Sequence, residues 1–348
     1  EAGRPVFFSA TLTDSPEVAN QAGALLLLTD SNRKRGQRWG TIRETQGYTE
    51  RADEVPLAED PTDQRLQAFP DLPGSQAVAF QEGVRASATA YGNPVTFVPS
   101  ARPFHAVDGD PLTAWSVSAF ADARGEQLLL EFEEPVPVAS VELEQAVTYG
   151  QNRVITDLRI HHADGSVDVA LGEESLLSGQ VVPLGIDSTS FLRLEILATS
   201  DGDPKWYFGF SGVGFSEVRV PGLSAQETVA LPTDLTDLLE GDRGQELAVL
   251  LTRLRSDPLD PVRSDGEEHL DRTFVLPWDR TFELTGESRL AADASPATVA
   301  ALLGSDDWPQ TASATSSLAG SVRSSAFAAI DGDEGTAWQA TLGRQDGQ

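Results

Sequence analysis

Short runs in which apolar and polar residues alternate recur through residues 76–221 and predict an all-β region. Alternation of this kind buries one face of a strand and leaves the other face in solvent. Asp164-Gly165 separates two such runs and predicts a hairpin, because an Asp-Gly pair favours a tight turn. Many short strands separated by turn residues predict a sandwich or jelly roll. Strands are expected at residues 128–132, 139–143, 158–162, 167–171, 191–196 and 213–220.

Residues 1–52 have a different pattern, typical of an α/β remnant truncated at its N-terminus. A strand end is expected at 5–8, and a helix at 15–23, since a serine N-cap followed by proline favours a helix start. The apolar run 24–28 then predicts a buried strand. A second helix is expected next, with Ser31 or Asn32 as its N-cap and with Arg33, Lys34, Arg35 and Arg38 on a solvated face.

Two further segments flank the predicted sandwich. Acidic residues and prolines make residues 53–75 a linker. Residues 222–309 are expected to form a small β-rich connecting domain, with strands at 247–254 and 272–290. A short helix is expected at 295–304, because the segment starts with Ser-Pro and ends with glycine.

One segment of the chain occurs twice. Residues 104–115 recur 223 positions later as 327–338, with eight of the twelve residues identical. The preceding Ala-Ser-Ala-Thr at 86–89 recurs at 312–315, in the same order. Two copies in one order predict a duplicated module, and the second copy, 310–348, is expected to be truncated.

Charge and composition exclude several classes of function. The chain has 54 acidic and 25 basic residues among 348, for a formal net charge of -29. Nucleic acid is therefore not expected as a partner, since phosphate binding needs a cationic face. The absence of cysteine excludes disulfides, a thiolate nucleophile and cysteine-bound metals. No apolar run reaches the ~18 residues of a membrane span, and no nucleophile elbow, phosphate loop or zinc-protease motif is present, so no catalytic residue is assigned.

The repeated segment has the residue types of a site that binds a cation through oxygen. Asp108 and Asp110 flank Gly109, which can fold the loop, and Thr113 adds a hydroxyl. Ca²⁺ prefers several hard oxygen ligands, main-chain carbonyls included. Trp115 would anchor such a loop in the core. The alternative is that the Asp-Gly pair only forms a turn.

With the Ala-Ser-Ala-Thr segment and the closing residues 214–220, this motif resembles the discoidin, or coagulation factor 5/8 type C, superfamily. In bacteria this superfamily overlaps with galactose-binding-like carbohydrate-binding modules. The resemblance covers residues 76–221 and the start of the second copy, and it implies a jelly-roll β-sandwich with a buried structural Ca²⁺. The ligands it implies are the carbonyl of Ala106 and the side chains of Asp108, Asp110, Thr113 and Glu217, and in the second copy an incomplete set of Asp331, Asp333 and Thr336.

Sugar contacts in such modules come from loops at one rim of the sandwich. They combine an aromatic face, which stacks on the sugar ring, with planar polar groups that bond its hydroxyls. Ordinary loop packing is the alternative role for each candidate. The candidates here are Tyr149, Gln151, Asn152 and Arg153 in one loop and Lys205, Trp206 and Tyr207 in another.

A narrower resemblance comes from residues 28–39, 42–44 and 47–50, with 91–95 and 220–222. The stretches at 28–50 are similar to the region ahead of the discoidin-like modules in actinobacterial α-(1→3)-arabinofuranosyltransferases of the D type, and residues 91–95 and 220–222 fit the same pattern. The resemblance implies a parent glycosyltransferase whose multi-spanning GT-C catalytic part lies outside these residues. The chain would bind an arabinan or galactan acceptor, or brace the assembly, at the extracytoplasmic face of the cell membrane.

Two alternatives stay open at this point. The modules could instead belong to a secreted glycoside hydrolase or adhesin that has no membrane part. They could also be purely structural and bind nothing but calcium. For a transferase parent, the membrane is expected as a partner only through a transmembrane part that lies outside these residues.

Overall fold

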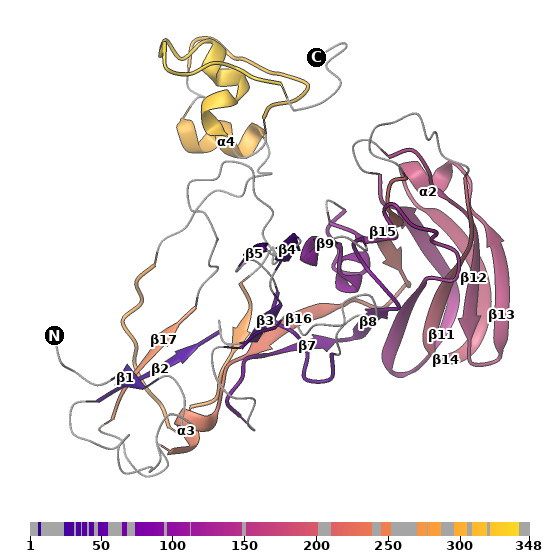
Figure 1. The fold of residues 1–348 in the computed structure, drawn as a ribbon, viewed down its shortest axis with the longest axis horizontal. Helices are drawn as coiled ribbons and strands as arrows, with labels where there is room; N and C mark the ends of the chain where they lie inside the picture. The colour runs from indigo at the N-terminus through magenta and orange to yellow at the C-terminus, as the bar shows by residue number, and fades with distance from the viewer. Residues whose placement is uncertain are drawn as a thin grey trace. The chain divides into compact units, whose positions relative to one another are not determined.

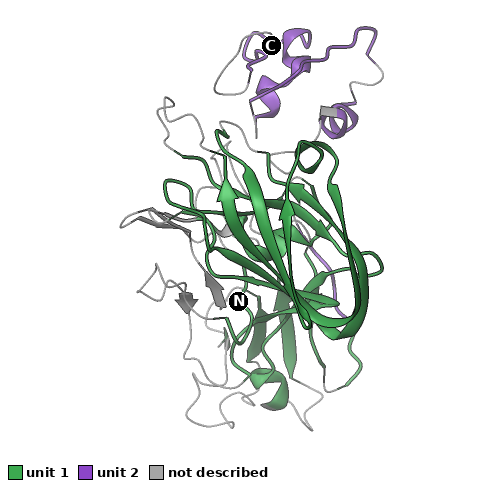
Figure 2. Ribbon diagram, turned by 90° about the vertical axis from the view of Figure 1, so that its right-hand side faces the viewer, with its two compact units in different colours: residues 1–255, 266–280 green, residues 256–265, 281–348 purple. Residues whose placement is uncertain are grey.

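A computed structural model describes most residues between 74 and 238 and shorter stretches on either side. The residues divide into two compact units, 1–255 with 266–280 and 256–265 with 281–348 (Figure 2). In the described part of the chain, no helix is long and apolar enough to cross a membrane. The described residues are 6–7, 24–30, 33–35, 37–39, 42–44, 48–54, 65–67, 74–93, 96–111, 113–147, 151–200, 210–238, 245–251, 270–276, 278–286, 296–304, 308–318 and 321–340.

Seven antiparallel strands in the first unit form the predicted sandwich (Figure 1). Six follow the order β10-β15-β11-β14-β12-β13, and β8 pairs with β11. The hairpin predicted at Asp164-Gly165 joins β12 to β13, and the mainly β fold class is confirmed. The elements are β8 Val84–Ala88, β10 Trp115–Val117, β11 Gln127–Gln145, β12 Ile155–His162, β13 Gly165–Ala170, β14 Gln180–Thr199 and β15 Val213–Arg219, with the short helix α2 Glu174–Leu177 before β14.

Two of these strands are long enough to serve both layers of the sandwich. β11 has 19 residues and β14 has 20, and the two pair along most of their length. Their register shifts in the stretch that contains Pro135 and Pro137, since proline cannot donate to the ladder and is found at edges and bulges. Before the shift β11 pairs with β8, and after it with β15. The strands expected at 128–132 and 139–143 are therefore one strand.

The main core lies between the two layers. Trp115 is fully buried, stacks on Phe215 with ring centroids 6.2 Å apart, and donates its ring N–H to the carbonyl of Ala90 at 3.0 Å. Full burial of an aliphatic side chain contributes roughly 1.5–3 kcal/mol, so this core supplies most of the stability of the unit. The other large, fully buried side chains here are Leu128, Leu130, Leu143, Ile155, Leu158, Ile160 and Leu192.

Residues before and after the sandwich meet in a second sheet. β7 Val78–Glu82 pairs with β16 Gln226–Ala230, which in turn pairs with β18 Arg272–Thr273. Tyr48 belongs to the sandwich core. Strands of the expected connecting domain therefore join a sheet begun ahead of the sandwich, and the sandwich core extends into the expected N-terminal remnant. The strand predicted at 272–290 is wrong beyond Thr273, because residues 274–276 and 278–286 form no strand.

A small parallel sheet of the same unit contains the buried strand predicted at 24–28. β2 Leu25–Thr29 lies between β1 Val6–Phe7 and β17 Glu246–Leu250, so the predicted strand end at 5–8 is also present. Leu26 and Leu28 pack with Leu231, Leu235 and Leu247, and Leu235 comes from α3 Asp234–Leu238.

The helix predicted over the basic cluster is wrong. β3 Arg33–Arg35 pairs with β6 Arg65–Gln67, and β4 Gln37–Trp39 pairs with β5 Ile42–Glu44 and β9 Thr96–Phe97. Like charges within one helical turn and the intervening glycine disfavour a helix, whereas short strands find partners elsewhere in the chain. The helix predicted at 15–23 lies outside the described residues.

The second unit contains the helix predicted at 295–304. α4 Pro296–Leu303 begins at the proline, and Gly304 follows it with the left-handed φ of +65° that glycine permits. Two short 3-10 helices follow, η5 Val322–Ser324 and η6 Ala326–Ala329, at the start of the second repeat copy.

Candidate functional site

The loop of the first repeat copy is closed by its own hydrogen bonds. It follows the 3-10 helix η3 Pro103–Ala106 and turns at Gly109, whose φ is +82°. The Thr113 hydroxyl donates to Oδ2 of Asp108 at 2.7 Å and to the carbonyl of Asp110 at 3.0 Å. The Asp110 N–H donates to Oδ1 of Asp108 at 3.1 Å. The loop thus orients the Asp108 carboxylate.

Glu217, on β15, brings a second carboxylate to this loop. Its side chain is 2 % exposed, and among the described residues its Oε1 atom has no hydrogen-bond partner. Burial raises the Glu217 pKa to about 7; Arg219, 3.7 Å away, lowers it, the Asp108 charge raises it, and a hydrogen bond from the Gly109 N–H lowers it. Burial likewise raises the pKa of Asp108 to about 6. A fully buried carboxylate and a half-buried one therefore act on each other at this loop.

The residues at this place fit a hard cation in part. In the described ranges, no three acidic or histidine side chains gather closely enough to hold a metal ion by themselves. A cation between Asp108 and Glu217 would therefore need other oxygens, such as the Ala106 carbonyl and the Thr113 hydroxyl. The unpartnered buried oxygen of Glu217 is what a cation would satisfy. Calcium itself stays a prediction.

The second repeat copy folds into the same loop. The Thr336 hydroxyl donates to Asp331 at 2.7 Å and to the carbonyl of Asp333 at 3.0 Å, and the Asp333 N–H donates to Asp331 at 2.9 Å. Gly332 has a φ of +76°. Here the aspartate is exposed, and the hydrogen bond from Thr336 is the largest of the effects that lower the Asp331 pKa.

Three of the predicted sugar contacts, Gln151, Asn152 and Arg153, can be placed, and they lie on one loop, where the Gln151 side-chain amide donates to the carbonyl of Arg153 at 3.1 Å. The Asn152 side chain accepts from the Ser211 N–H at 3.0 Å, and the Asn152 N–H donates to the Ser211 hydroxyl at 3.1 Å. These bonds join the loop at 151–153 to the chain before β15. The other candidates Tyr149, Lys205, Trp206 and Tyr207 lie outside the described residues.

Arg153 is the centre of this end of the sandwich. Its side chain is buried and donates to the carbonyls of Ser118 at 2.6 Å, Ala121 at 2.8 Å and Ser211 at 2.8 Å. The guanidinium also lies 5.2 Å from the centre of the Phe210 ring. This geometry favours a role in ordering three loops, and direct contact between Arg153 and a sugar stays a prediction.

Sequence reasoning missed two aromatic residues at this rim. Phe120 is 56 % exposed and has a φ of +68°, which is uncommon for a residue with a side chain. Its N–H donates to the carbonyl of Phe210 at 2.9 Å, and Phe210 is itself 38 % exposed. Such a backbone conformation persists only where its surroundings enforce it, as Arg153 does here. Nothing in the local pattern marked Phe120, because its exposure depends on the three loops meeting.

No protein-family model matches the chain. An alpha-(1->3)-arabinofuranosyltransferase of Mycolicibacterium smegmatis is 26 % identical over 261 residues, which cover 70 % of this chain and 17 % of that protein. The alpha-(1->3)-arabinofuranosyltransferase of Mycobacterium tuberculosis is 29 % identical over 257 residues, which cover 70 % of this chain and 18 % of that protein. The chain thus spans less than a fifth of the length of these relatives.

A solved structure of an arabinofuranosyltransferase agrees with this match. A mutant of the arabinofuranosyltransferase AftD from Mycobacteria matches with a TM-score of 0.56 and 18 % identity, over 94 % of this chain and 26 % of that one. The family 32 carbohydrate-binding module of Clostridium perfringens NanJ, in complex with galactose, covers 42 % of this chain and all of its own, with 18 % identity and a TM-score of 0.29. The chain is therefore homologous to part of the mycobacterial alpha-(1->3)-arabinofuranosyltransferases and shares the fold of that part of AftD.

Proposed function

We propose that the chain is a non-catalytic, glycan-binding part of a membrane arabinofuranosyltransferase that acts in the assembly of cell-wall arabinogalactan or lipoarabinomannan. The similarity to two arabinofuranosyltransferases supports the parent. In this proposal the catalytic carboxylate and the membrane helices lie in other parts of the parent. The sandwich faces the extracytoplasmic side and holds the arabinan or galactan acceptor.

The observation that carries sugar binding is the exposed ring of Phe120 on a rim of three joined loops. A sugar has an apolar C–H face that stacks on an aromatic ring, and hydroxyls that need polar groups beside it. Arg153 holds the loops in place, so the ring needs little ordering when a ligand arrives. The neighbouring Asn152 supplies a planar amide at the same rim.

Calcium is the second part of the proposal. Asp108, Thr113, Glu217 and the carbonyl of Ala106 would hold it, with Asp110 completing the loop. The ion would neutralise two buried carboxylates and fix the start of the sandwich to β15. The ion would stabilise the fold and would take no part in binding a ligand at the rim.

The rim is tested by titrating the full chain with arabinan and galactan oligosaccharides by NMR. We expect shifts at the amides of Phe120, Asn152 and Phe210, with a Kd on the order of 0.1 to 1 mM, because a hydrogen bond formed in water adds only ~1 kcal/mol. Phe120→Ala should weaken binding by about fivefold or more, since stacking of this kind contributes about 1 kcal/mol. Phe80→Ala is the matched control, because Phe80 is 51 % exposed on β7.

Equal affinity in the two variants would assign sugar binding to a place other than Phe120. An absence of shifts at millimolar sugar would leave a structural, calcium-stabilised role. The burial of Arg153 is the observation that favours that second role. Binding of both glycans by an intact rim would also be expected of a secreted hydrolase or adhesin. The sequence upstream of the chain distinguishes that alternative from the transferase.

A further inference from the structure

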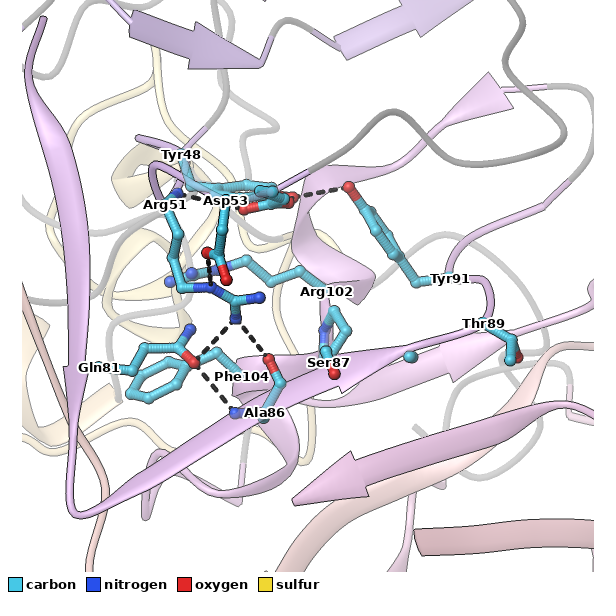
Figure 3. Close-up of a pocket in the computed structure, with 13 residues that line it drawn as sticks. Tyr48, Arg51, Asp53, Gln81, Ala86, Ser87, Thr89, Tyr91, Arg102 and Phe104 are labelled. Carbon is cyan, nitrogen blue, oxygen red and sulfur yellow. Dashed lines mark hydrogen bonds and ion pairs between the residues drawn. The ribbon is translucent and has the colours of Figure 1, made fainter. Parts of the chain in front are cut away.

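A cavity lies along one edge of the sandwich, and none of its lining residues belongs to the Phe120 rim. It has a volume of about 450 Å³, within the range of small-molecule sites, and all its lining residues belong to the first unit (Figure 3). Residues 48–54 form one side of it, and β8 with the start of η3 forms the other. Because residues 48–54 precede the sandwich, the predicted module by itself would lack this cavity.

The cavity lies on the free edge of β8. Among the described strands, β8 pairs only with β11. On the other edge, Arg51 donates to the carbonyl of Ala86 at 2.8 Å, and the Ala86 N–H donates to Gln81 at 3.0 Å (Figure 3). Side chains that occupy an edge in this way prevent a further strand from adding there. The next residue with outward-facing peptide groups is Ala88, which lines the cavity. A compact ligand therefore fits this edge better than an extended peptide.

The charges around the cavity favour a neutral ligand. The Nε atom of Arg51 lies 3.3 Å from Asp53, which also pairs with Arg85. Arg102 forms a two-pronged ion pair with Glu227, at 2.7 and 2.8 Å. Each of these guanidinium groups already has a carboxylate, so a phosphate or carboxylate ligand would find no uncompensated positive charge.

Both polar and apolar groups line the cavity. The Ser87 hydroxyl and one amino group of Arg51 have no partner in the described part of the chain, and both border the cavity (Figure 3). Pro103 and Phe104 line it with apolar atoms. A ligand that satisfies such a wall carries several hydroxyls and an apolar face.

We propose that this cavity binds one neutral sugar residue of a glycan, as a second saccharide site that is independent of the rim. The inference shares the ligand class of the proposed function but none of its residues. Two sites on one sandwich would hold two points of the same polymer. Linked binding of this kind raises the overall affinity for a long chain above that for a short one.

The test is an NMR titration of the full chain with arabinan and galactan oligosaccharides. We expect shifts at the amides of Arg51, Ser87 and Ala88 in addition to those at the rim. Ser87→Phe places a ring in the cavity and should weaken the cavity shifts at least about tenfold, while the rim shifts of the same sample stay unchanged. Ser166→Phe is the matched control, because Ser166 is exposed on β13 and should change neither set.

Each outcome separates this site from the rim. Rim shifts without cavity shifts in the unmodified chain would overturn the inference and leave the proposed function intact. Cavity shifts that survive Ser87→Phe would also overturn it, and no shifts at either place would overturn both proposals. If Ser87→Phe loses the dispersed amide signals of β11, Ser87→Val replaces it; the lost hydroxyl should then weaken the cavity site about fivefold, and unchanged affinity would count against the inference.

Discussion

The two copies of the repeated loop share the hydrogen bonds of the threonine and the tryptophan, but the pKa of the first aspartate shifts in opposite directions. In each copy a threonine hydroxyl donates to the first aspartate at 2.7 Å. In each, the tryptophan ring N–H donates at 3.0 Å to the carbonyl that follows Ala-Ser-Ala-Thr, from Ala90 in one copy and Ser316 in the other. Yet the pKa of Asp108 is raised to about 6 by burial, whereas that of Asp331 is lowered.

The difference comes from what packs over the loop. Trp115 is fully buried against Phe215, whereas Trp338 is 36 % exposed. Glu217 faces the first loop from β15, more than a hundred residues along the chain. A short motif thus determines a turn, and the surrounding sandwich determines whether that turn becomes a buried, charged site.

The largest expected difference between the copies is at the tryptophans. Trp115→Ala should cost about 3–5 kcal/mol of unfolding free energy, because it leaves a large cavity in the core. Trp338→Ala should cost less than about 1 kcal/mol, as exposed substitutions do. Native-state amide exchange measures both, since it reports the free energy of opening segment by segment. Equal losses in the two copies would contradict the difference in packing.

The local parts of the fold could be predicted from sequence, and the long-range parts could not. The hairpin at Asp164-Gly165 and the helix α4 depend on neighbouring residues, and both are present. The pairing of β16 with β7 joins residues about 150 positions apart, which no local pattern encodes. The helix predicted over the basic cluster at 33–38 is wrong for the same reason, because the strands found there depend on partners elsewhere in the chain.

The next expected difference is in the pH dependence of stability without divalent cations. Asp108 and Glu217 have raised pKa values, so the folded chain binds their protons more tightly than the unfolded chain does. Their contribution to the unfolding free energy should therefore fall as the pH rises from about 4 to about 7 and then level off, whereas His105, whose pKa is lowered by burial to about 3, contributes in the opposite direction below about pH 6.5. Thermal unfolding at pH 5 and pH 7.5 measures this, at about 2–4 °C per kcal/mol.

Glu217→Gln removes one of the two charges and should flatten this fall, so that the variant is more stable than the parent chain at pH 7.5. Asp331→Asn is the control in the second copy and should leave the profile unchanged, because its carboxylate is exposed. If Glu217→Gln changed the unfolding free energy by the same amount at pH 5 and at pH 7.5, this would contradict the raised pKa of the buried Glu217.

The candidate sites, like the fold, have a part that the local sequence predicts and a part that depends on tertiary packing. The Asp108 loop was found from its repeat, and the resemblance to discoidin modules named Glu217 as its partner; the structure brings the two carboxylates together. The sequence predicts Arg153 at a ligand, but its carbonyl partners come from two other loops, 118–121 and the chain at Ser211, whose meeting with its own loop depends on tertiary packing. The exposure of Phe120 and the Ser87 cavity depend on tertiary packing in the same way.

Calorimetric titration of the full chain with Ca²⁺ tests most directly whether packing turns one of the two loops into a cation site. We expect a single site per chain, lost in Asp108→Asn and in Glu217→Gln and retained in Asp331→Asn. Bound calcium should also reverse the order of stability at pH 7.5, because the parent chain gains about 2.7 kcal/mol at a calcium concentration about 100 times Kd and the Glu217→Gln variant gains nothing. Heat of binding that survives Asp108→Asn, or that is absent from the parent chain, would contradict the claim that packing makes a cation site of the Asp108 loop.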